Sequence, residues 1–300
     1  MADLDCFDAV LAAVAGRPPL RVAVVGAGEP GVLTGVVEAV EADLIEPVLV
    51  GDGAEIAEAA ARAGTDVGSF PVVQADDEVA AADQGRRLVT DGEVGGLVKG
   101  RVHTDVFLGP IVRHLRTRRR ISHAFVLDLP SYHKLLTITD AAVNIAPDLA
   151  AKRAITQNGV DLARLFGVAS PKVAALSAVE LVNPAIPSSV DAACLAVMGQ
   201  RQQIKGAVVD GPLAFDLAIS AESADVKRVA SPVAGDVDVL VVPDLDAGNI
   251  LVKDLAYLAE ATLAGVVLGA AVPCVLTSRA DPPRSRMLSC ALAVLAAHPA

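Results

Sequence analysis

The stretch SPVAGDVDVLVVPDLDAGNILVK, from Ser231 to Lys253, decides the fold. Its β-rich apolar run from Val237 to Val242 ends at a proline, and a helical pattern resumes after a polar turn. A strand, a turn and a helix in this order form the crossover unit of an α/β sheet, in which ligands bind at the carboxyl ends of the strands. The same residues also favour helix capping, so the stretch alone leaves both interpretations open. The polar residues of the turn are Asp244, Asp246, Gly248 and Asn249.

Units of the same kind extend along the chain on both sides of this stretch. Short apolar runs alternate with segments of helical period, which is typical of mostly parallel, doubly wound sheets. The helix after Gly248 is expected to continue to about Ala264, and the chain from 137 to 144 is expected to be a polar loop. Two α/β units with a crevice between them are the economical architecture. The expected strands are 21–25, 47–50, 71–74, 95–98, 123–127, 172–176, 206–210, 237–242 and 272–276.

The composition limits the classes of protein to which the chain can belong. Its 300 residues suit two domains of ordinary size. Hydrophobic residues make up 53% and aromatic residues 3%, so the core is expected to consist of Val, Leu, Ile and Ala, as in sheets covered by Ala-rich helices. The net charge of −11 argues against a general binder of nucleic acids or of anionic membranes. A local basic pocket for an anionic ligand remains compatible with this charge.

The cysteines and the amino terminus favour a reduced, cytoplasmic setting. The four cysteines form no C-x-x-C pair and have no histidine at metal-ligand spacing, so we assign them no disulfide, metal or nucleophilic role. The five histidines form no triad and are expected to be structural. The first residues, MADLDCFDAV, lack the basic region and apolar core of a secretory signal. The longest apolar run, Gly265 to Leu276, is too short to span a bilayer and is interpreted as a buried helix end followed by a strand.

The motif GAGEPG, from Gly26 to Gly31, fits the G-x-G-x-x-G pattern directly after an expected strand. With Asp52 just past the second strand, it matches the dinucleotide-binding fingerprint in spacing and context. Glycine turns at the first crossover of any α/β sheet produce the same pattern by chance, and a plain turn explains Asp52 equally well. An NAD-dependent dehydrogenase therefore remains an alternative hypothesis.

Two later segments place polar groups at strand ends. In VVDGPLAFDLAIS, from Val208 to Ser220, a strand delivers Asp210 into a Gly-Pro turn, and Asp216 then shares a helix face with Ser220. Helix capping is the alternative explanation of this segment. In LTSRAD, from Leu276 to Asp281, a hydroxyl and a guanidinium follow a strand. Such a pair suits an oxyanion, because hydroxyl and main-chain N–H groups donate and arginine adds a charged double donor. A surface salt bridge is the alternative explanation here.

These segments resemble the phosphate acetyltransferase and phosphate butyryltransferase family, and the likeness to the butyryltransferase branch extends from about Arg21 to Leu288. GAGEPG stands where members of that family carry a variable turn, which weakens the nucleotide interpretation. The most specific motifs are TDAAVNIAPDL (139–149), PKVAALSAVELVNP (171–184), VDGPLAFDLAIS (209–220), VAGDVDVLVVPDLDAGN (233–249) and LTSRAD (276–281).

The resemblance implies the reversible reaction acyl-CoA + phosphate ⇌ acyl phosphate + CoA, by direct attack of bound thiolate on bound acyl phosphate in a ternary complex. It implies two doubly wound α/β domains around an interdomain cleft, similar to isocitrate and isopropylmalate dehydrogenases. Residues 1–120 and 267–300 would form the first domain and 121–266 the second. CoA and phosphate are substrates, so no cofactor and no metal are expected. A homodimer or a higher homo-oligomer is expected, with no nucleic acid or membrane partner.

The resemblance also assigns individual residues. Ser278 and Arg279 match the family's Ser-Arg pair, which contacts phosphate and the reacting carbonyl, and Asp281 is our candidate for the base that removes the thiol proton. Lys99 and Thr104 follow a strand end and are further candidates for phosphate binding, although a solvated turn explains them too. The matched substrate-binding positions of the two strand-end motifs are Asp210, Asp244, Gly248, Asn249 and Lys253.

Three positions depart from the acetyltransferase branch. The acid proposed there as the base, seven positions beyond the serine, is here Ser285. An arginine past the Lys253 equivalent is here Tyr257, and another is replaced near Gly109-Pro110. A smaller cationic set would leave room for a longer acyl chain, so we expect a butyryl-like substrate. The same losses leave a CoA-binding protein without turnover as a second alternative. The basic run 113–120 either meets the phosphates of CoA or suits a helix end.

Overall fold

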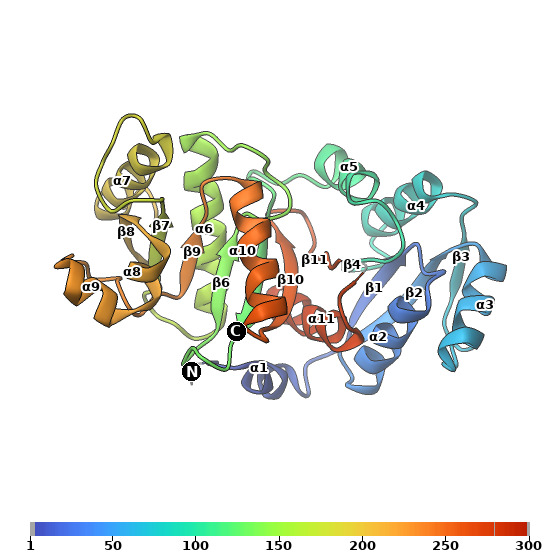
Figure 1. The fold of residues 1–300 in the computed structure, drawn as a ribbon. Coiled ribbons are helices and arrows are strands. Elements are labelled where there is room, and N and C mark those ends of the chain that lie inside the picture. Colours follow the sequence, from blue (N-terminus) through green and yellow to red (C-terminus); the bar gives the residue numbers. More distant parts are fainter. Residues whose placement is uncertain (1–3, 279, 299–300) are drawn as a thin grey trace. The chain divides into compact units, whose positions relative to one another are not determined.

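The computed structural model describes residues 4–278 and 280–298. The described chain divides into two compact units. The first unit contains Asp8–Ile121 together with the chain from Ala264 onward, and the middle unit contains Ser122–Leu263 together with the amino-terminal residues through Phe7. From Asp8 onward the chain forms most of the first unit, then the middle unit, and then returns to the first, as the colours of Figure 1 show.

The sheet of the first unit has the strand order β3-β2-β1-β4-β11-β10. Neighbouring strands from β3 to β11 run parallel, and β10 runs antiparallel to β11. The carboxyl ends of the parallel strands therefore meet at one edge of the sheet. The strands are β1 (Leu20–Val25), β2 (Ile45–Gly51), β3 (Val72–Gln74), β4 (Gly96–Lys99), β10 (Thr262–Leu268) and β11 (Cys274–Val275).

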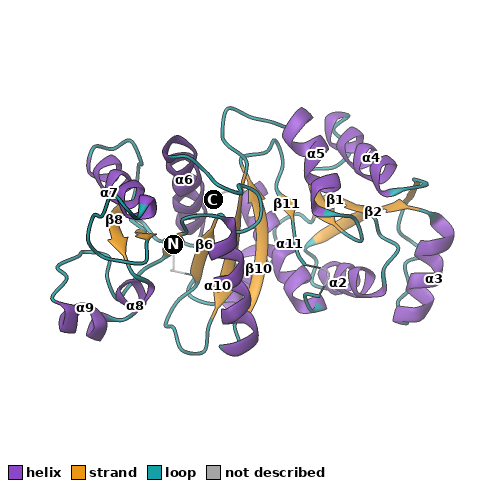
Figure 2. Ribbon diagram, turned by 45° about the horizontal axis from the view of Figure 1, so that its top comes forward, coloured by secondary structure: helices purple, strands orange, loops and turns teal. Residues whose placement is uncertain are grey.

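Helices cover both faces of this sheet (Figure 2). On one side lie α4 (Glu78–Thr90) and α5 (Thr104–His114), and on the other lie α2 (Pro30–Glu41), α3 (Gly53–Ala63) and α11 (Pro283–Ala297). The first helix, α1 (Phe7–Val14), precedes β1. Acidic side chains begin three of these helices, because Glu29, Asp52 and Asp77 accept hydrogen bonds from the first-turn N–H groups of α2, α3 and α4. Local capping thus fixes where each helix begins.

The sheet of the middle unit has the order β5-β6-β9-β7-β8. Strand β5 runs antiparallel to β6, and the other neighbours are parallel. The strands are β5 (Ser122–Asp128), β6 (Leu136–Thr139), β7 (Lys172–Leu176), β8 (Val208–Leu213) and β9 (Val239–Val241). The helices are α6 (Leu149–Leu165), α7 (Pro187–Gln200), α8 (Phe215–Ile219), α9 (Ala221–Lys227) and α10 (Leu245–Leu258).

Strand β9 explains why the opening stretch needs an unbroken apolar run. Successive side chains of a strand point to opposite faces. Leu240 packs into one buried cluster with residues of α8 and α10, whereas Val239 and Val241 pack into another with residues of α6 and α7. Because helices cover both faces, every position of the strand is buried, and the alternating pattern of a half-exposed strand disappears.

Two sequence-based expectations about secondary structure were wrong. The segment around Gly265, interpreted as a helix end, is strand β10, and α10 stops at Leu258. Five consecutive buried residues, 263–267, fill an interior strand, and periodicity alone does not separate such a run from a buried helix. The expected polar loop contains strand β6, in which Thr137 and Thr139 are buried. No helix among the described residues is long and apolar enough to cross a membrane.

Candidate active site

Strand β9 leads into the first group of predicted binding residues. Asp244 caps α10, where its carboxylate accepts a hydrogen bond from the Ala247 N–H at 2.9 Å. One turn later, Asn249 donates from Nδ2 to the carbonyl oxygen of Ala141 at 3.3 Å. Gly248 is buried, and a Cβ at that position would lie 2.7 Å from Val242 Cγ2 and 2.9 Å from Ala141 Cβ. The start of α10 therefore packs tightly on the loop that follows β6.

Asp140 organises that loop, although no role was predicted for it from the sequence. It is 3% exposed, and its carboxylate accepts the main-chain N–H groups of Ala142 and Val143 at 3.0 Å and of Asn144 at 3.2 Å. Hydrogen bonds of this kind from a carboxylate to the next residues define a turn. An acid directly after a buried strand was the available signal, and it lies inside the motif TDAAVNIAPDL.

Asp210 and Lys253 have looser surroundings. Asp210 lies in β8, is half-buried and accepts a hydrogen bond from the N–H of Gly211 at 2.9 Å. Lys253 is exposed on α10, one turn after Asn249. Among the described residues, no hydrogen bond or ion pair joins Asp210 to Asp244, Asn249 or Lys253. The structure thus brings the α10 residues to the end of β9 and leaves Asp210 on the edge strand β8.

In the motif from Val208 to Ser220, the polar residues after Asp210 make structural contacts. Asp216 forms an ion pair of 2.8 Å with Lys227, and the hydrogen bond from that lysine lowers the pKa of the Asp216 carboxyl. Ser220 caps α9 by accepting the Ser223 N–H at 3.1 Å. The helix-capping explanation of Ser220 is therefore correct. The side chains of Asp216 and Ser220 both contact residues of α9.

In the first unit, Ser278 and Asp281 of the LTSRAD motif bond to each other after the carboxyl end of β11, an arrangement called here the Ser278 turn. The exposed Ser278 donates its N–H to Asp281 Oδ2 at 2.7 Å, and the Asp281 N–H donates to the Ser278 carbonyl at 3.2 Å. The predicted residue Arg279 lies outside the described part of the chain. Ser285, which stands where the acetyltransferase branch has an acid, is buried in α11 and bonds through its carbonyl to Ser289 Oγ.

Arg286 on α11 holds this turn through hydrogen bonds, and this role was not predicted from the sequence. The residue is 4% exposed and donates to Thr277 Oγ1 at 2.9 Å and to the Ser278 carbonyl at 3.0 Å. The available signal was a charged residue on a helix that is otherwise buried at successive positions, since Leu288 and Ser289 are also buried.

Lys99 and Thr104 lie near the same edge of the first unit's sheet. Lys99 is the last residue of β4, is 3% exposed and donates to the Gly100 carbonyl at 3.5 Å. Strand β11 pairs with β4 so that Val275 lies opposite Val98, and the segment leading to Ser278 therefore leaves the sheet beside Lys99. Thr104 is the half-buried first residue of α5.

The GAGEPG turn has little capacity left for a dinucleotide. Both carboxylate oxygens of Glu29 accept N–H groups of α2, from Gly31 at 3.1 Å and Val32 at 2.8 Å. These donors, and the positive end of the helix dipole, are what a pyrophosphate would use. Asp52 likewise caps α3. The adjoining pocket of about 240 Å³ is lined by the acids Asp52, Glu55, Asp76, Asp77 and Glu78 and by Arg101.

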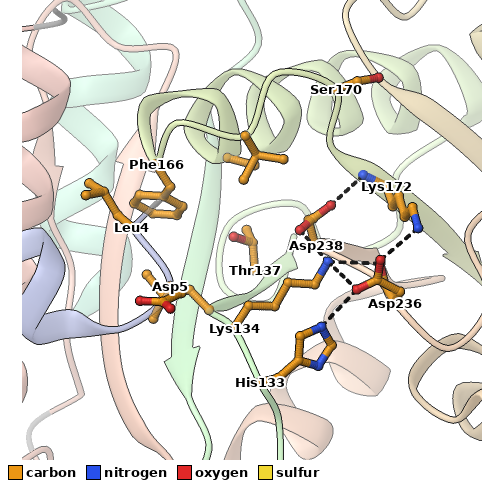
Figure 3. Close-up of a pocket in the computed structure, with 13 residues that line it drawn as sticks. Leu4, Asp5, His133, Lys134, Thr137, Phe166, Ser170, Lys172, Asp236 and Asp238 are labelled. Atoms are coloured by element: carbon orange, nitrogen blue, oxygen red, sulfur yellow. Dashed lines mark hydrogen bonds and ion pairs between the residues drawn. The ribbon is translucent and has the colours of Figure 1, made fainter. Parts of the chain in front are cut away.

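A larger pocket of about 360 Å³ lies in the middle unit, and none of the predicted site residues lines it (Figure 3). Its polar wall is an ion-pair network in which Asp236 contacts Lys134 at 2.8 Å and Lys172 at 2.7 Å. Burial raises the pKa of the Asp236 carboxyl, but hydrogen bonds from Lys134, Lys172 and His133 outweigh it and hold the pKa well below its usual range. The network joins residues at the starts of β7 and β9, which is the edge opposite the α10 residues.

Comparison with known proteins shows relatives whose matched regions include both the start of α10 and the Ser278 turn. The family model described as Phosphate acetyl/butaryl transferase matches residues 79–294. A phosphate acetyltransferase of Rhizobium meliloti is 47% identical over an alignment that covers 96% of this chain and 92% of the relative. A phosphate butyryltransferase of Clostridium acetobutylicum is 39% identical, with 98% and 99% covered. A solved structure of a branched-chain phosphotransacylase from Enterococcus faecalis V583 is 34% identical, with a TM-score of 0.81 and 93% and 99% covered.

The matched residues include Lys99, the start of α10 and the Ser278 turn, all of which lie within 79–294. The alignments with the two enzymes extend along nearly the whole chain. By this match and these alignments, the chain belongs to the phosphate acetyl/butyryl transferase family of acyltransferases.

Proposed function

We propose that the protein transfers a short-chain acyl group between coenzyme A and inorganic phosphate. The observation that carries the proposal is the Ser278 turn, in which a family motif is folded at a strand end and braced by a buried arginine. The acyltransferase class is given by the family. The names of the relatives, which concern acetyl, butyryl and branched-chain substrates, support the choice of acyl donor.

The reaction balances without any group beyond the two substrates. In one direction the CoA thiol loses its proton to a base, the thiolate sulfur bonds to the acyl carbon, and the carbon–oxygen bond to phosphate breaks with its electron pair leaving on phosphate. No atom changes oxidation state overall, so we propose no cofactor. Attack within a ternary complex needs no covalent enzyme intermediate, and holding the two substrates together supplies much of the rate.

Each predicted residue receives a role in this scheme. Ser278 and Arg279 would bind phosphate and the carbonyl oxygen on which charge develops. Asp281 would act as the base, since its carboxylate lies in the same turn as Ser278, whose N–H donates to Asp281 Oδ2. Asp244 and Asn249 are bonded to the main chain and would position substrate through the surface they shape. Asp210, Gly248, Lys253, Lys99 and Thr104 would complete the substrate-binding set.

The test is phosphate-dependent release of free thiol from acyl-CoA, followed over several acyl chain lengths. We expect release that requires phosphate and that reverses when acyl phosphate and CoA are supplied. Absence of release with every chain, while CoA still binds, would replace the proposal with a CoA-binding protein that lacks turnover. Binding of a nicotinamide cofactor together with substrate oxidation would favour the dehydrogenase, which the capped start of α2 makes the weaker candidate.

The acyl chain is expected to be longer than acetyl, because Tyr257 and the Gly109-Pro110 region replace arginines of the acetyltransferase branch. We predict a higher kcat/KM for butyryl-CoA than for acetyl-CoA. A preference for acetyl-CoA by about tenfold or more, equal to about 1.4 kcal/mol in barrier, would refute this expectation. This comparison of the two acyl-CoA substrates is needed because one relative, 47% identical, is named phosphate acetyltransferase and another, 39% identical, is named phosphate butyryltransferase.

Two substitutions test the assignment of the Ser-Arg pair. Ser278→Ala and Arg279→Ala are each expected to lower turnover by about tenfold or more, because each removes a donor to a developing negative charge. Arg284→Ala is the matched control, since Arg284 is exposed on α11 and pairs with Asp8 at 3.4 Å. Wild-type rates in both site variants would remove the assignment.

We further propose that the protein is a cytoplasmic homodimer or higher homo-oligomer. All four cysteines are free, which suits a reducing compartment. Two-fold assemblies are the commonest oligomers of soluble enzymes. Light scattering after size-exclusion chromatography measures the mass directly, and a monomer at micromolar concentration would contradict the proposal.

A further inference from the structure

Arg286 is a buried cation whose side chain reaches out of its own helix. It lies on α11, where Ser285, Leu288 and Ser289 are also buried. Its Nη1 donates to Thr277 Oγ1 at 2.9 Å and its Nη2 donates to the Ser278 carbonyl at 3.0 Å. One planar group therefore holds a side chain and a main-chain oxygen of the two residues that precede Arg279.

The charges around the guanidinium compensate its burial. Burial lowers the pKa of Arg286, and the carboxylates of Glu29 and Asp281 oppose that shift. An uncompensated buried charge is strongly destabilising, so these acids are part of the arrangement. Asp281 also accepts the Ser278 N–H. The same carboxylate thus closes the turn and balances the cation behind it.

Helix α2 is shaped to admit the arginine. A Cβ at Gly35 would lie 2.8 Å from the Cβ of Arg286 and 3.1 Å from the Pro283 carbonyl. The missing side chain at Gly35 therefore lets α11 and the arginine stem approach α2 closely. Glu29, at the start of the same helix, is one of the two compensating acids. This explains part of GAGEPG without a nucleotide.

We propose that Arg286 is a positioning residue for the acyl transfer. It fixes the backbone of Thr277 and Ser278, and so preorganises the groups of Ser278 and Arg279 that are proposed to donate to substrate. The proposal rests on the function proposed above for the Ser278 turn. Arginine suits the task because its planar fork serves two acceptors in fixed geometry, whereas the ammonium of a lysine is a compact point charge. The residue acts through the turn and need not touch substrate.

The first test compares Arg286→Lys with Arg284→Lys, which makes the same change two residues away at an exposed position of α11. Arg286→Lys is expected to lower kcat by about tenfold while KM for acyl-CoA changes by less than about threefold, because the loss falls on preorganisation rather than on binding of CoA. Arg284→Lys is expected to match the wild type. An unchanged kcat in a folded Arg286→Lys variant would overturn the proposal.

A second readout needs no substrate. Hydrogen exchange of the amides in 277–281 is expected to accelerate by about tenfold or more in Arg286→Lys, with the peptides of α2 unchanged. Equal exchange in the variant and the wild type would show that Arg286 does not hold the turn. If the wild type itself shows no phosphate-dependent activity, the proposed function fails, whereas this measurement still decides whether the arginine fixes the segment.

A change on the acceptor side, Thr277→Val, covers the case in which Arg286→Lys does not fold. Thr277→Val removes one acceptor of the guanidinium and keeps the side-chain volume. We expect Thr277→Val to lower kcat by about threefold or more. Where Arg286→Lys folds, the double variant is expected to lose less than the product of the single losses, because both changes break the same contact. A kcat of Thr277→Val equal to that of the wild type would contradict the proposed path from Arg286 to the turn.

Discussion

At the scale of single residues, Thr137 has an unusual hydroxyl. Thr137 is 1% exposed in β6, and its Oγ1 has no hydrogen-bond partner among the described residues. It lines the pocket of about 360 Å³ in the middle unit, where Asp236 and Asp238 bond to the neighbouring lysines (Figure 3). A buried hydroxyl without a hydrogen-bond partner destabilises the folded state, because it has lost its hydrogen bonds to water. Valine has a similar shape and no hydroxyl, so it avoids this cost.

We therefore predict that Thr137→Val raises the free energy of unfolding by about 1 kcal/mol. Urea denaturation measures the change. Thr139→Val serves as the control, because Thr139 Oγ1 donates to the His123 carbonyl at 2.8 Å and its replacement is expected to destabilise the protein. A loss of stability in Thr137→Val would mean that a bound water or ligand uses the hydroxyl.

Single residues also show how far sequence reasoning reached. Asp244, Gly248, Asn249 and Ser278 were proposed because they follow apolar runs and match motifs of the family, and both signals are local features of the sequence. The bracing role of Arg286 is not local, because α11 must first pack against α2 at Gly35 before the guanidinium meets the turn. Motif resemblance located the turn itself, and packing located its support.

At the scale of elements, the network around Asp236 joins segments that are distant in the chain. Asp236 precedes β9, Lys172 begins β7, and Lys134 lies before β6. Asp238 adds an ion pair of 2.8 Å with Lys134 and accepts the Lys172 N–H at 2.7 Å. The starts of three neighbouring strands are thereby tied together at the edge opposite α10.

The pH dependence of stability should reveal this network. Hydrogen bonds hold the folded-state pKa of Asp236 below its ordinary value of 3.8, so its contribution is fully present above that value and is lost as the pH falls below it. We predict that Asp236→Asn lowers the melting temperature near pH 6 and that its difference from the wild type shrinks below pH 4. Asp254→Asn, at an exposed position of α10, is the control. A difference that stays constant down to pH 3 would contradict the linkage.

Elements also mark the limit of pattern reading. The doubly wound α/β class followed from alternating apolar and amphipathic segments, and it is confirmed. Strand β10 was missed because Leu263 to Val267 are all buried, and a buried strand and a buried helix carry the same unbroken apolar pattern. Only pairing within a sheet decides between them, and β10 pairs with β11 on one side.

At the scale of the whole molecule, the binding of a substrate should raise the free energy of unfolding. A ligand at 100 times its Kd stabilises the folded state by about 2.7 kcal/mol. We predict that CoA raises the melting temperature by about 5 °C at that concentration and that NADH does not. Differential scanning fluorimetry with both ligands checks this. A rise with NADH alone would revive the dehydrogenase hypothesis that GAGEPG suggested.

The position of β11 has a consequence for how the protein is made. This strand lies between β4 and β10 in the sheet of the first unit, although it is translated after all the other strands of that unit. Synthesis proceeds from the amino terminus, and domains tend to fold as their residues emerge. The sheet of the first unit is therefore expected to be completed beside β4 only after Cys274 and Val275 have been translated. The Ser278 turn follows that strand directly, so this turn is expected to form only after β11 has been translated.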